Sequence, residues 1–333
     1  MGLIKVKNVH KIFKTPQKSK FFGLIKQDYK VVEALKNISF EVPEGQIIGY
    51  IGRNGSGKST TIKLLTGIMQ PSKGQIIIDG LDPYKHRKQL NFNIGTVFGQ
   101  RTQLWWDLPL IDSLILLKDI YNINSHDFQK KLKKYNEVLQ LDQILHKPVR
   151  FLSLGQRMKG DLAAALLHSP KILYLDEPTI GLDIETKELI REFILEINKE
   201  NNVTVILTTH DVSDINQLCE RIIFIDEGKI YFDDSMNKLK EKFGSNQIIS
   251  LKADSQIQIP TQISNRVNIQ LESEYEVICH FDESLITSSE ILFSFIQAKN
   301  VITDFRISAY DPESLIKNLY RSSLEEVKNV TYR

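Results

Sequence analysis

Short apolar runs of strand length recur in the first 240 residues of the chain. Runs of four to eight apolar residues that end at glycine or at acidic residues are typical of strands buried on both faces. A helical spacing follows the first run at Ile62, Leu64 and Leu65, and another helical run spans 162–167. The pattern therefore predicts buried strands and helices that follow one another along the chain. The strand-length runs are 47–51, 172–175 and 203–207.

The pattern changes near Gly244. An amphipathic stretch at 236–243 ends at this glycine, as helices commonly do. Alternating segments follow, then a helical pattern, a strand, and a helix that begins near Pro312. We expect a first domain at 1–240 and a small α+β domain at 245–333. The expected elements of the second domain are strands around 247–253 and 275–281, a helix over about 283–299 and a strand at 301–310.

Length and composition agree with this division. At about 150 residues per domain, 333 residues suggest two domains. The hydrophobic share of 41% and the charged share of 25% exclude a disordered or collagen-like chain. No apolar stretch approaches the ~18 residues of a membrane-spanning helix, and the start lacks the apolar core of a signal peptide. Cys219 and Cys279 are too few for a disulfide framework or a zinc cluster, so we expect core thiols in a reducing compartment.

The charge is unevenly distributed. A net charge of +2 gives no reason to expect a nucleic-acid partner. Residues 245–333 contain eight Lys or Arg and twelve Asp or Glu, a net charge of −4, so residues 1–244 carry +6. Nine lysines in 1–36 stand against only Asp28 and Glu33. The basic surface is either a solvated face or one that meets phosphates or an anionic membrane leaflet.

Glycines and a lysine follow the first apolar run. Residues 52–59 read Gly-Arg-Asn-Gly-Ser-Gly-Lys-Ser. Glycines let successive backbone N–H groups turn towards phosphate oxygens, and the following helix offers its positive end to the same anion. In this arrangement Lys58 reaches the β- and γ-phosphates, and the Ser59 hydroxyl can ligate Mg²⁺. The sequence predicts a nucleoside-triphosphate site at this loop, here called the phosphate loop.

Two acidic residues, Asp176 and Glu177, end the run at 172–175. A carboxylate in the position of Asp176 can hold the shell of a magnesium ion. Glu177 points elsewhere and could polarise an attacking water as general base. Alone the pattern is weak, because strands often end in acids. Beside a phosphate loop it becomes strong.

A third motif narrows the choice. Residues 152–156 read Leu-Ser-Leu-Gly-Gln and lead into the helical run at 162–167. With the other two motifs in order, residues 1–240 resemble the ATP-binding cassette (ABC) ATPases, whose signature at this place is Leu-Ser-Gly-Gly-Gln. The resemblance implies an α/β fold of the phosphate-loop type with a helical subdomain at about 101–165. It also implies an ATPase that uses ATP and Mg²⁺.

The resemblance assigns catalytic and metal-binding roles to single residues. Gln100 matches the residue that touches the metal and links to the transport partner, and His210 matches the switch histidine at the γ-phosphate. It implies that Glu177, His210 and Gln100 are catalytic. It further implies that Ser59, Gln100 and Asp176 hold the metal.

Nucleotide contacts are carried over in the same way. Tyr29 has the family's spacing for the aromatic ring that stacks on adenine, with Phe13, Phe21 and Phe22 as alternatives. The other implied contacts are Gly52, Asn54, Gly55, Ser56, Gly57, Lys58, Ser59 and Thr60 in the phosphate loop, and Ser153, Gly155, Gln156 and Asp183 across a dimer.

Two positions depart from the family's pattern. Leu154 replaces the first glycine of the signature, which reduces the freedom of the backbone there. Ile180 and Gly181 stand where the family often has Ser-Ala. Neither change removes a catalytic group, so we expect an active ATPase.

One phosphate loop and one signature in a single chain imply, by the same resemblance, a head-to-tail dimer. ATP on Lys58 of one subunit would be covered by Ser153 of the other, whose helix directs its dipole at the γ-phosphate. Binding of two ATP closes the dimer, and hydrolysis lets it open. The single cassette favours a homodimer, with a heterodimer as the alternative.

A membrane partner is implied as well. The stretch at 97–109 and the lysine-rich insertion before Tyr29 are similar to bacterial ATPases of the sodium-extruding and drug-exporting types, which work with separate ABC-2-class permeases. This implies export, a place at the cytoplasmic face of the cell membrane, and no nucleic-acid partner. Trp105 and Trp106 either anchor a cytoplasmic helix of the permease or pack inside the helical subdomain.

Other classes of phosphate-loop protein fit less well. Cassette ATPases of translation usually carry two cassettes in one chain, and those of DNA repair contain a long coiled coil for which 61–151 leaves no room. Small-molecule kinases lack the signature and the switch histidine. No ligand motif stands out in 245–333.

Overall fold

The computed structural model describes residues 2–21, 24–99, 101–243, 246–283, 285–309 and 319. The chain forms two compact units, Met1–Asp233 and Asp234–Arg333. The boundary precedes the change of pattern at Gly244, because the helix α8 (Met236–Phe243) falls within the second unit.

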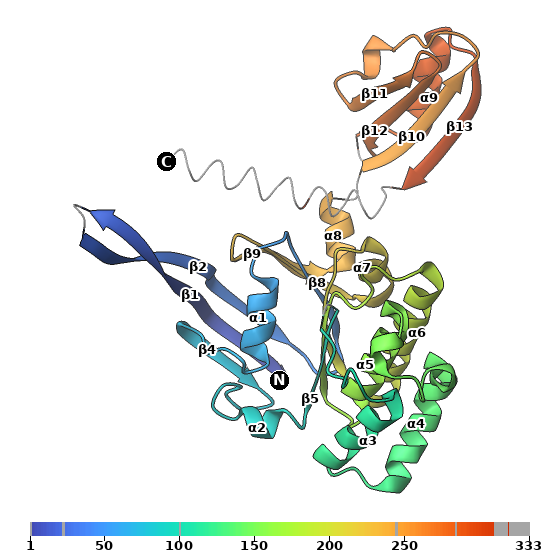
Figure 1. The fold of residues 1–333 in the computed structure, drawn as a ribbon. Helices are drawn as coiled ribbons and strands as arrows, with labels where there is room; N and C mark the ends of the chain where they lie inside the picture. The colour runs from blue at the N-terminus through green and yellow to red at the C-terminus, as the bar shows by residue number, and fades with distance from the viewer. Residues whose placement is uncertain are drawn as a thin grey trace. The chain divides into compact units, whose positions relative to one another are not determined.

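A six-stranded sheet in the order β5-β6-β7-β3-β8-β9 forms the centre of the first unit (Figure 1). The pairs from β5 through to β8 are parallel. Strands β3 and β7 are buried along their whole length, as their continuous apolar runs require. Because β6, β7 and β3 are parallel neighbours, the loops that follow them meet at one edge of the sheet. The bounds are β3 Ile47–Ile51, β5 Ile94–Phe98, β6 Ile172–Asp176, β7 Thr204–Thr208, β8 Arg221–Asp226 and β9 Lys229–Ser235.

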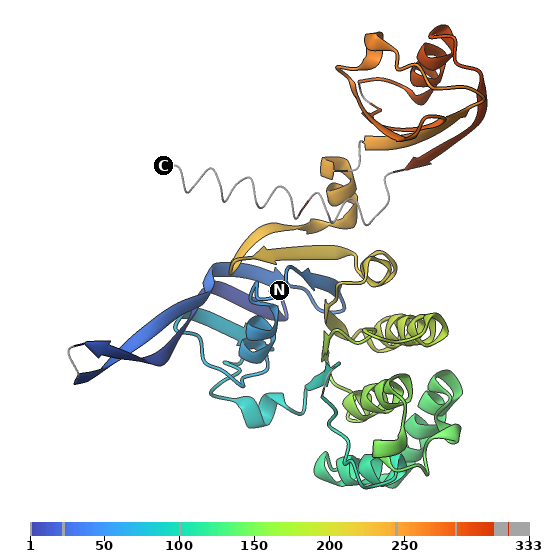
Figure 2. The same ribbon diagram turned by 45° about the horizontal axis from the view of Figure 1, so that its top comes forward.

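A second, antiparallel sheet has the order β2-β1-β4. Its strands are β1 (Ile4–Phe21), β2 (Leu24–Val42) and β4 (Lys73–Ile78). One apolar core joins this sheet to helix α1 (Lys58–Leu65) and to β3. Strand β4 pairs only with the first part of β1, so β1 and β2 continue beyond it as a two-stranded ribbon (Figures 1 and 2).

Helices α3 to α6 gather on one side of the unit, and the β1–β2 ribbon projects on another (Figure 2). Helix α5 buries an alanine-rich face and contacts α3 and α4. None of the helices among the described residues is long and apolar enough to cross a bilayer. The helices of this unit are α1, α2 Arg87–Leu90, α3 Leu110–Ile120, α4 Ser125–Leu139, α5 Leu154–Leu166, α6 Ile184–Asn201 and α7 Val212–Leu218, with short 3-10 turns at Leu141–Gln143 and Val149–Phe151.

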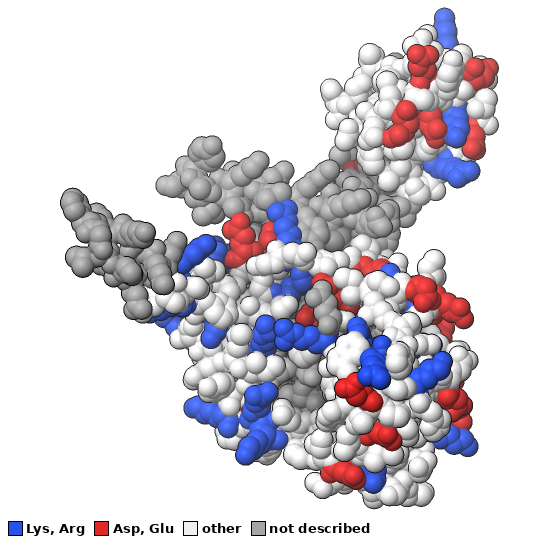
Figure 3. All heavy atoms as spheres, in the orientation of Figure 1, with Lys and Arg blue, Asp and Glu red and all other residues white. Residues whose placement is uncertain are grey.

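The surface charge of the first unit is mixed over the helices. Over α2 the charged side chains visible in Figure 3 are basic, in keeping with the exposed Lys85, Arg87 and Lys88. The two cysteines are buried, Cys219 after α7 and Cys279 in the second unit, so the prediction of core thiols is confirmed. Burial raises the pKa of the Cys279 thiol to about 12.

The second unit is a four-stranded antiparallel sheet, β11-β12-β10-β13, with helix α9 on one face. The predicted α+β composition is confirmed, although the sequence pattern does not predict strand β11. The helix expected over 283–299 is shorter, because Thr287 and Glu290 form a capping box that fixes its start. The helix expected near Pro312 lies outside the described residues. The bounds are β10 Asn246–Ala253, β11 Val267–Ser273, β12 Glu276–Asp282, α9 Ser288–Gln297 and β13 Ile302–Ala309, with a 3-10 turn at Thr261–Ile263.

Candidate functional site

The phosphate loop joins β3 to α1. Gly52 lies so close to β8 that a Cβ there would be 2.0 Å from the Ile225 carbonyl oxygen, so no other residue fits. Gly57 has a φ of 115° and precedes the first residue of α1 without a side-chain cap. The first N–H groups of α1 are therefore not taken up by a capping side chain.

Lys58 is held inside this loop. Its Nζ donates to the Gly52 carbonyl at 2.6 Å and to the Arg53 carbonyl at 3.0 Å, and the residue is only 6% exposed. Burial lowers the pKa of the ammonium, and the charges of Glu177, Asp176 and Asp226 partly oppose that shift. An ammonium has three donors, so one remains for an anion at the mouth of the loop.

The end of β6 brings two carboxylates to the same edge of the sheet. Asp176 accepts a hydrogen bond from the Thr208 hydroxyl of β7. Glu177 has a φ of 54°, which is uncommon for a residue with a side chain, and its N–H donates to the Thr208 carbonyl at 2.9 Å. A turn with this uncommon φ joins Asp176 to Glu177, and the expectation that the two side chains point in different directions stays a prediction.

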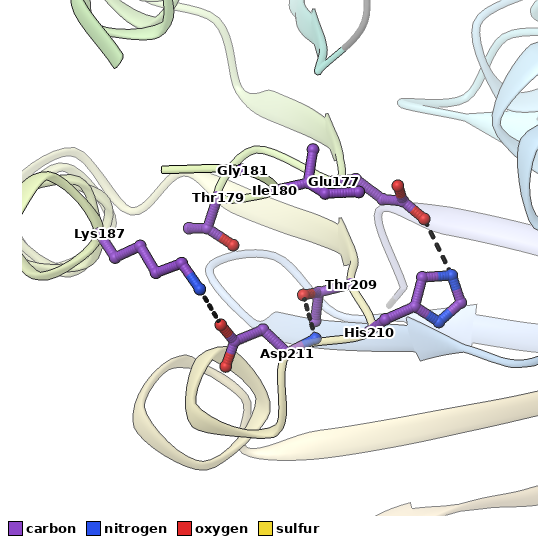
Figure 4. Close-up of a pocket in the computed structure, with 8 residues that line it drawn as sticks. All are labelled: Glu177, Thr179, Ile180, Gly181, Lys187, Thr209, His210 and Asp211. Atoms are coloured by element: carbon purple, nitrogen blue, oxygen red, sulfur yellow. Dashed lines mark hydrogen bonds and ion pairs between the residues drawn. The ribbon is translucent and has the colours of Figure 1, made fainter. Parts of the chain in front are cut away.

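Glu177 faces His210, which follows β7. Glu177 Oε1 and His210 Nε2 are 2.9 Å apart, across a pocket of about 120 Å³ that Thr179, Gly181 and Asp211 also line (Figure 4). Both side chains remain partly open, at 22% and 37% exposure. A carboxylate and an imidazole at this distance can hold or pass a proton between them.

A buried ion pair supports this pocket from behind, and sequence reasoning missed it. Asp214 of α7 is fully buried and accepts from Arg191 Nε at 2.7 Å and from the Thr209 hydroxyl at 2.8 Å. The Thr179 hydroxyl donates to the same carboxylate. One carboxylate thus holds both the loop after Glu177 and the residue before His210. The available signal was an arginine between the buried Ile190 and Phe193 in α6.

The pocket also has an outer ion pair. Lys187 Nζ lies 2.5 Å from Asp211 Oδ2 (Figure 4). Partial burial is the largest influence and raises the pKa of the Asp211 carboxyl, but the hydrogen bonds from Lys187 and the Ser213 N–H together with the charges of Lys187 and Arg191 outweigh it, so the net pKa is lowered. The residue directly after His210 is therefore held as an anion.

A second cavity, of about 370 Å³, contains the signature residues. Ser153, Gln156, Lys159 and Asp183 line it. Ser153 caps α5: its Oγ accepts from the Gln156 N–H at 3.2 Å, and the Gln156 side chain accepts from the Ser153 N–H. Asp183 caps α6 by accepting from the Thr186 N–H, which lowers the pKa of its carboxyl. Two capped helix N-termini thus open into one exposed cavity.

The two departures from the family's pattern meet in space. A Cβ on Gly181 would lie 3.2 Å from Leu154 Cδ2, and Gly181 has a φ of 71°. Leu154 therefore occupies space that an alanine at 181 would need. The larger residue in the signature therefore lies beside the smaller one in the crossing loop.

The remaining predicted residues are placed as follows. Ser59 and Asn54 are exposed at the loop, and Thr60 is partly exposed. Tyr29 lies in β2 opposite Pro16 and is 54% exposed. Gln100 lies outside the described residues. Gly55 is exposed with a φ of 82°, and a Cβ on Gly155 would lie 3.0 Å from a carbon of the Thr186 side chain.

Comparisons with known proteins agree with this geometry. The family described as "ABC transporter" matches residues 35–180. The ABC transporter ATP-binding protein NatA of Bacillus subtilis (strain 168) is 30% identical over 66% of this chain and 89% of its own length. The chain belongs to the ABC transporter ATP-binding proteins. The bacitracin transport ATP-binding protein BcrA of Bacillus licheniformis, a second ABC ATPase, is 33% identical over 69% of this chain and 72% of its own.

Solved ABC cassettes share the fold. The dimeric post-hydrolysis state of the ATP-binding cassette MJ0796, bound to ADP and Pi, has a TM-score of 0.60 and 28% identity, and covers 70% of this chain and 98% of that chain. The predicted α/β cassette fold and the ABC ATPase activity are confirmed at this level.

The residues present fit MgATP, the substrate of ABC ATPases. Ser56 Oγ is buried inside the phosphate loop with no hydrogen-bond partner among the described residues. Such an atom is costly unless something completes its bonding. Lys58 has a donor to spare, and the Ser59 hydroxyl and the Asp176 carboxylate are the oxygen ligands that Mg²⁺ prefers.

Proposed function

We propose that this chain is the ATP-hydrolysing subunit of an exporter, and that it closes as a head-to-tail dimer around two MgATP. The observation that carries the proposal is the division of the site. Lys58, Glu177 and His210 surround the phosphate-loop side, whereas Ser153 and Asp183 line a separate cavity. Each side by itself is open at the surface.

On the phosphate-loop side the residues have distinct tasks. Lys58 and the first N–H groups of α1 bind the β- and γ-phosphates. Ser59 and Asp176, with Gln100, hold Mg²⁺, which supplies charge neutralisation at the phosphates. Glu177 takes a proton from the attacking water, and His210 orients the carboxylate and the γ-phosphate. Their contact at 2.9 Å supports this division of work.

Adenine recognition belongs to the β1–β2 ribbon. We assign it to Tyr29, whose side chain is 54% exposed in β2 and whose aromatic ring is the kind of group that stacks on a base.

On the signature side, Ser153 donates to the γ-phosphate bound by the other subunit. The N-terminus of α5 adds its dipole to that contact, and Gly155 and Gln156 lie in the same turn. Asp183 crosses to the partner from the start of α6. The dimeric form of the MJ0796 cassette supports this assembly for the present chain.

The membrane partner is a permease of the ABC-2 class, and the chain works at the cytoplasmic face of the cell membrane through it. Trp105 and Trp106 are 40% and 51% exposed, which favours the anchoring role over packing in the core. The name of BcrA, a bacitracin transport ATP-binding protein, supports a transporter of small molecules. Replacing both tryptophans with alanine should abolish capture of a multi-span membrane protein from native membranes and leave basal ATPase activity intact.

Glu177→Gln tests the core of the proposal. The variant should bind ATP, form dimers in MgATP and hydrolyse about 10² to 10⁴ times more slowly, because the general base is lost. Light scattering after gel filtration reports the dimer, and phosphate release reports hydrolysis. Glu192→Gln, the same change on the exposed side of α6, is the matched control and should behave as wild type. A fully active Glu177→Gln would remove the general-base assignment, and a monomer in saturating MgATP would remove the dimer.

A further inference from the structure

One carboxylate interrupts the apolar face of the signature helix. Helix α5 buries Met158, Gly160, Leu162 and three alanines, and among them Asp161 is only 3% exposed. Burial raises the pKa of this carboxyl to about 6, although the hydrogen bond from Thr102 and the charge of Arg157 oppose the shift. An apolar residue would be the less costly choice at such a position. The cost of burying this carboxylate therefore suggests that Asp161 has a specific task.

One carboxylate oxygen of Asp161 accepts hydrogen bonds from two consecutive residues. Asp161 Oδ1 accepts from the Thr102 hydroxyl at 2.8 Å and from the Gln103 N–H at 3.1 Å. The Gln103 side chain donates in return to the Asp161 backbone carbonyl at 3.2 Å. Thr102 and Gln103 begin the stretch of residues 102–106, here called the tryptophan segment, which ends at Trp105 and Trp106.

Neighbouring positions of α5 hold the same segment by packing. A Cβ on Gly160 would lie 2.9 Å from a methyl carbon of Leu110 and 3.1 Å from one of Leu104, so the helix lies against this region without a gap. Arg157 places its guanidinium 5.6 Å from the centre of the Trp106 ring. Three positions of α5 between Arg157 and Asp161 thus contact the tryptophan segment.

The same helix begins at Ser153, in the second cavity. A helix is stiff over two turns, so a movement at its first residue displaces Asp161 as well. The tryptophan segment has a second anchor on a different helix, since the Trp105 N–H donates to the buried Ser113 hydroxyl of α3 at 3.2 Å. The segment is therefore held between α5 and α3.

We propose that Asp161 is a positioning residue that couples the tryptophan segment to helix α5. When dimer closure moves the signature end of α5 at Ser153, the segment moves with the helix, and the surroundings of Trp105 and Trp106 change. The inference rests on the proposed dimer closure, and it adds the connection between that closure and the surface assigned to the permease. It predicts that loss of Asp161 uncouples the two ends and leaves nucleotide binding in place.

The test uses the tryptophans themselves, because the chain contains only these two. Acrylamide quenching of tryptophan emission is measured for full-length Glu177→Gln protein with and without MgATP. We expect MgATP to change the quenching constant in this parent. Adding Asp161→Asn should reduce that change severalfold, because a neutral amide replaces an acceptor that serves two donors.

Two further variants separate linkage from local damage. Thr102→Val removes one donor from the other side of the contact with little change of volume, and it should reduce the response in the same direction. Ser113→Ala loosens Trp105 from α3 instead of α5, and it should keep the response to MgATP. If Asp161→Asn does not fold, as judged by circular dichroism, the Thr102→Val result decides.

The outcomes distinguish this inference from the proposed function. A parent that does not dimerise in MgATP defeats the proposed function, whatever Asp161 does. A parent that dimerises with no change at the tryptophans overturns the linkage. So does an Asp161→Asn variant that dimerises and keeps the full response, or a loss of response in Ser113→Ala equal to that in Asp161→Asn.

Discussion

The edge of the parallel sheet and the core of the second unit are built differently. At the edge, Lys58, Arg191 and Asp214 are buried with their charges. In the second unit, the core around Phe295 is apolar, and Asn300 is the one polar residue buried among those that the structure describes there. Its amide is satisfied by backbone groups, including the Phe295 carbonyl at 2.8 Å.

The difference indicates which buried groups of the protein take part in chemistry. Burying a charge is costly, so a fold keeps it only where the charge is paired and used. Apolar packing by itself gives stability without assigning a task. Substitutions at the sheet edge should therefore change catalysis, and substitutions in the second unit should change stability alone.

The largest difference in the rate of ATP hydrolysis is expected between alanine variants of two histidines of the first unit. His210→Ala should slow ATP hydrolysis by about 10² to 10⁴-fold with ATP binding retained, because Glu177 loses its partner. His168 is the matched control: it stacks on Tyr121 with ring centres 4.0 Å apart, and burial lowers its pKa to about 4. His168→Ala should lower the melting temperature and leave the rate per folded molecule unchanged. Phosphate release and thermal melting measure the two effects, and equal rate losses would contradict the contrast.

Removing the buried cation should have the next largest effect. Arg191→Met leaves Asp214 buried without its partner, which typically costs about 3 to 5 kcal/mol of unfolding free energy. It should also slow hydrolysis, because Asp214 holds Thr179 and Thr209 on either side of the pocket. Lys134, paired with Glu200 at a half-exposed surface, is the control, and Lys134→Met should cost less than about 1 kcal/mol. Urea unfolding that gave the two variants equal losses would remove the distinction between buried and exposed pairs.

The raised pKa of Asp161 should make the stability of the protein depend on pH. Its pKa is raised from 3.8 to about 6, so the folded chain binds this proton more tightly than the unfolded chain. The extra proton affinity of the fold stabilises it fully at a pH below 3.8, and this stabilisation is lost as the pH rises through about 6. The loss in the free energy of unfolding is about 3 kcal/mol in all, because the two pKa values differ by roughly two. Urea unfolding at pH 5 and pH 7.5 should show the upper part of this loss in wild type relative to Asp161→Asn. A parallel dependence in both proteins would contradict the assignment.

The smallest effect tests the apolar region. Ile291→Val in the second unit should cost about 1 kcal/mol and leave hydrolysis unchanged. Ile206→Val in β7 is the same change at an equally buried position of the first unit. Similar losses in urea unfolding with unchanged rates are expected for both, whereas a rate effect of Ile291→Val would give the second unit a part in catalysis.

The contrast also explains how far the sequence could predict the structure. The phosphate loop, the paired acids of β6 and the capped helix at Ser153 are local patterns, so each is visible in a few consecutive residues. The Arg191–Asp214 pair joins two helices, and the close approach of Leu154 to Gly181 joins the first turn of α5 to the loop after β6. Neither contact leaves a mark in the local pattern. The apolar pattern that includes Leu285 predicts a start of α9 that is too early. The cap at Thr287 decides where the helix begins.

Whether the two sides of the site are completed by a second subunit is the central question. Lys58→Ala and Ser153→Ala should each be nearly inactive as homodimers, since every site contains one defective side. A mixture contains about half heterodimers, and each of these has one site with both sides intact. Mixing should therefore restore up to about a quarter of the wild-type ATPase rate. A mixture that stays as inactive as its components, in proteins shown to dimerise with each other, would contradict the head-to-tail site.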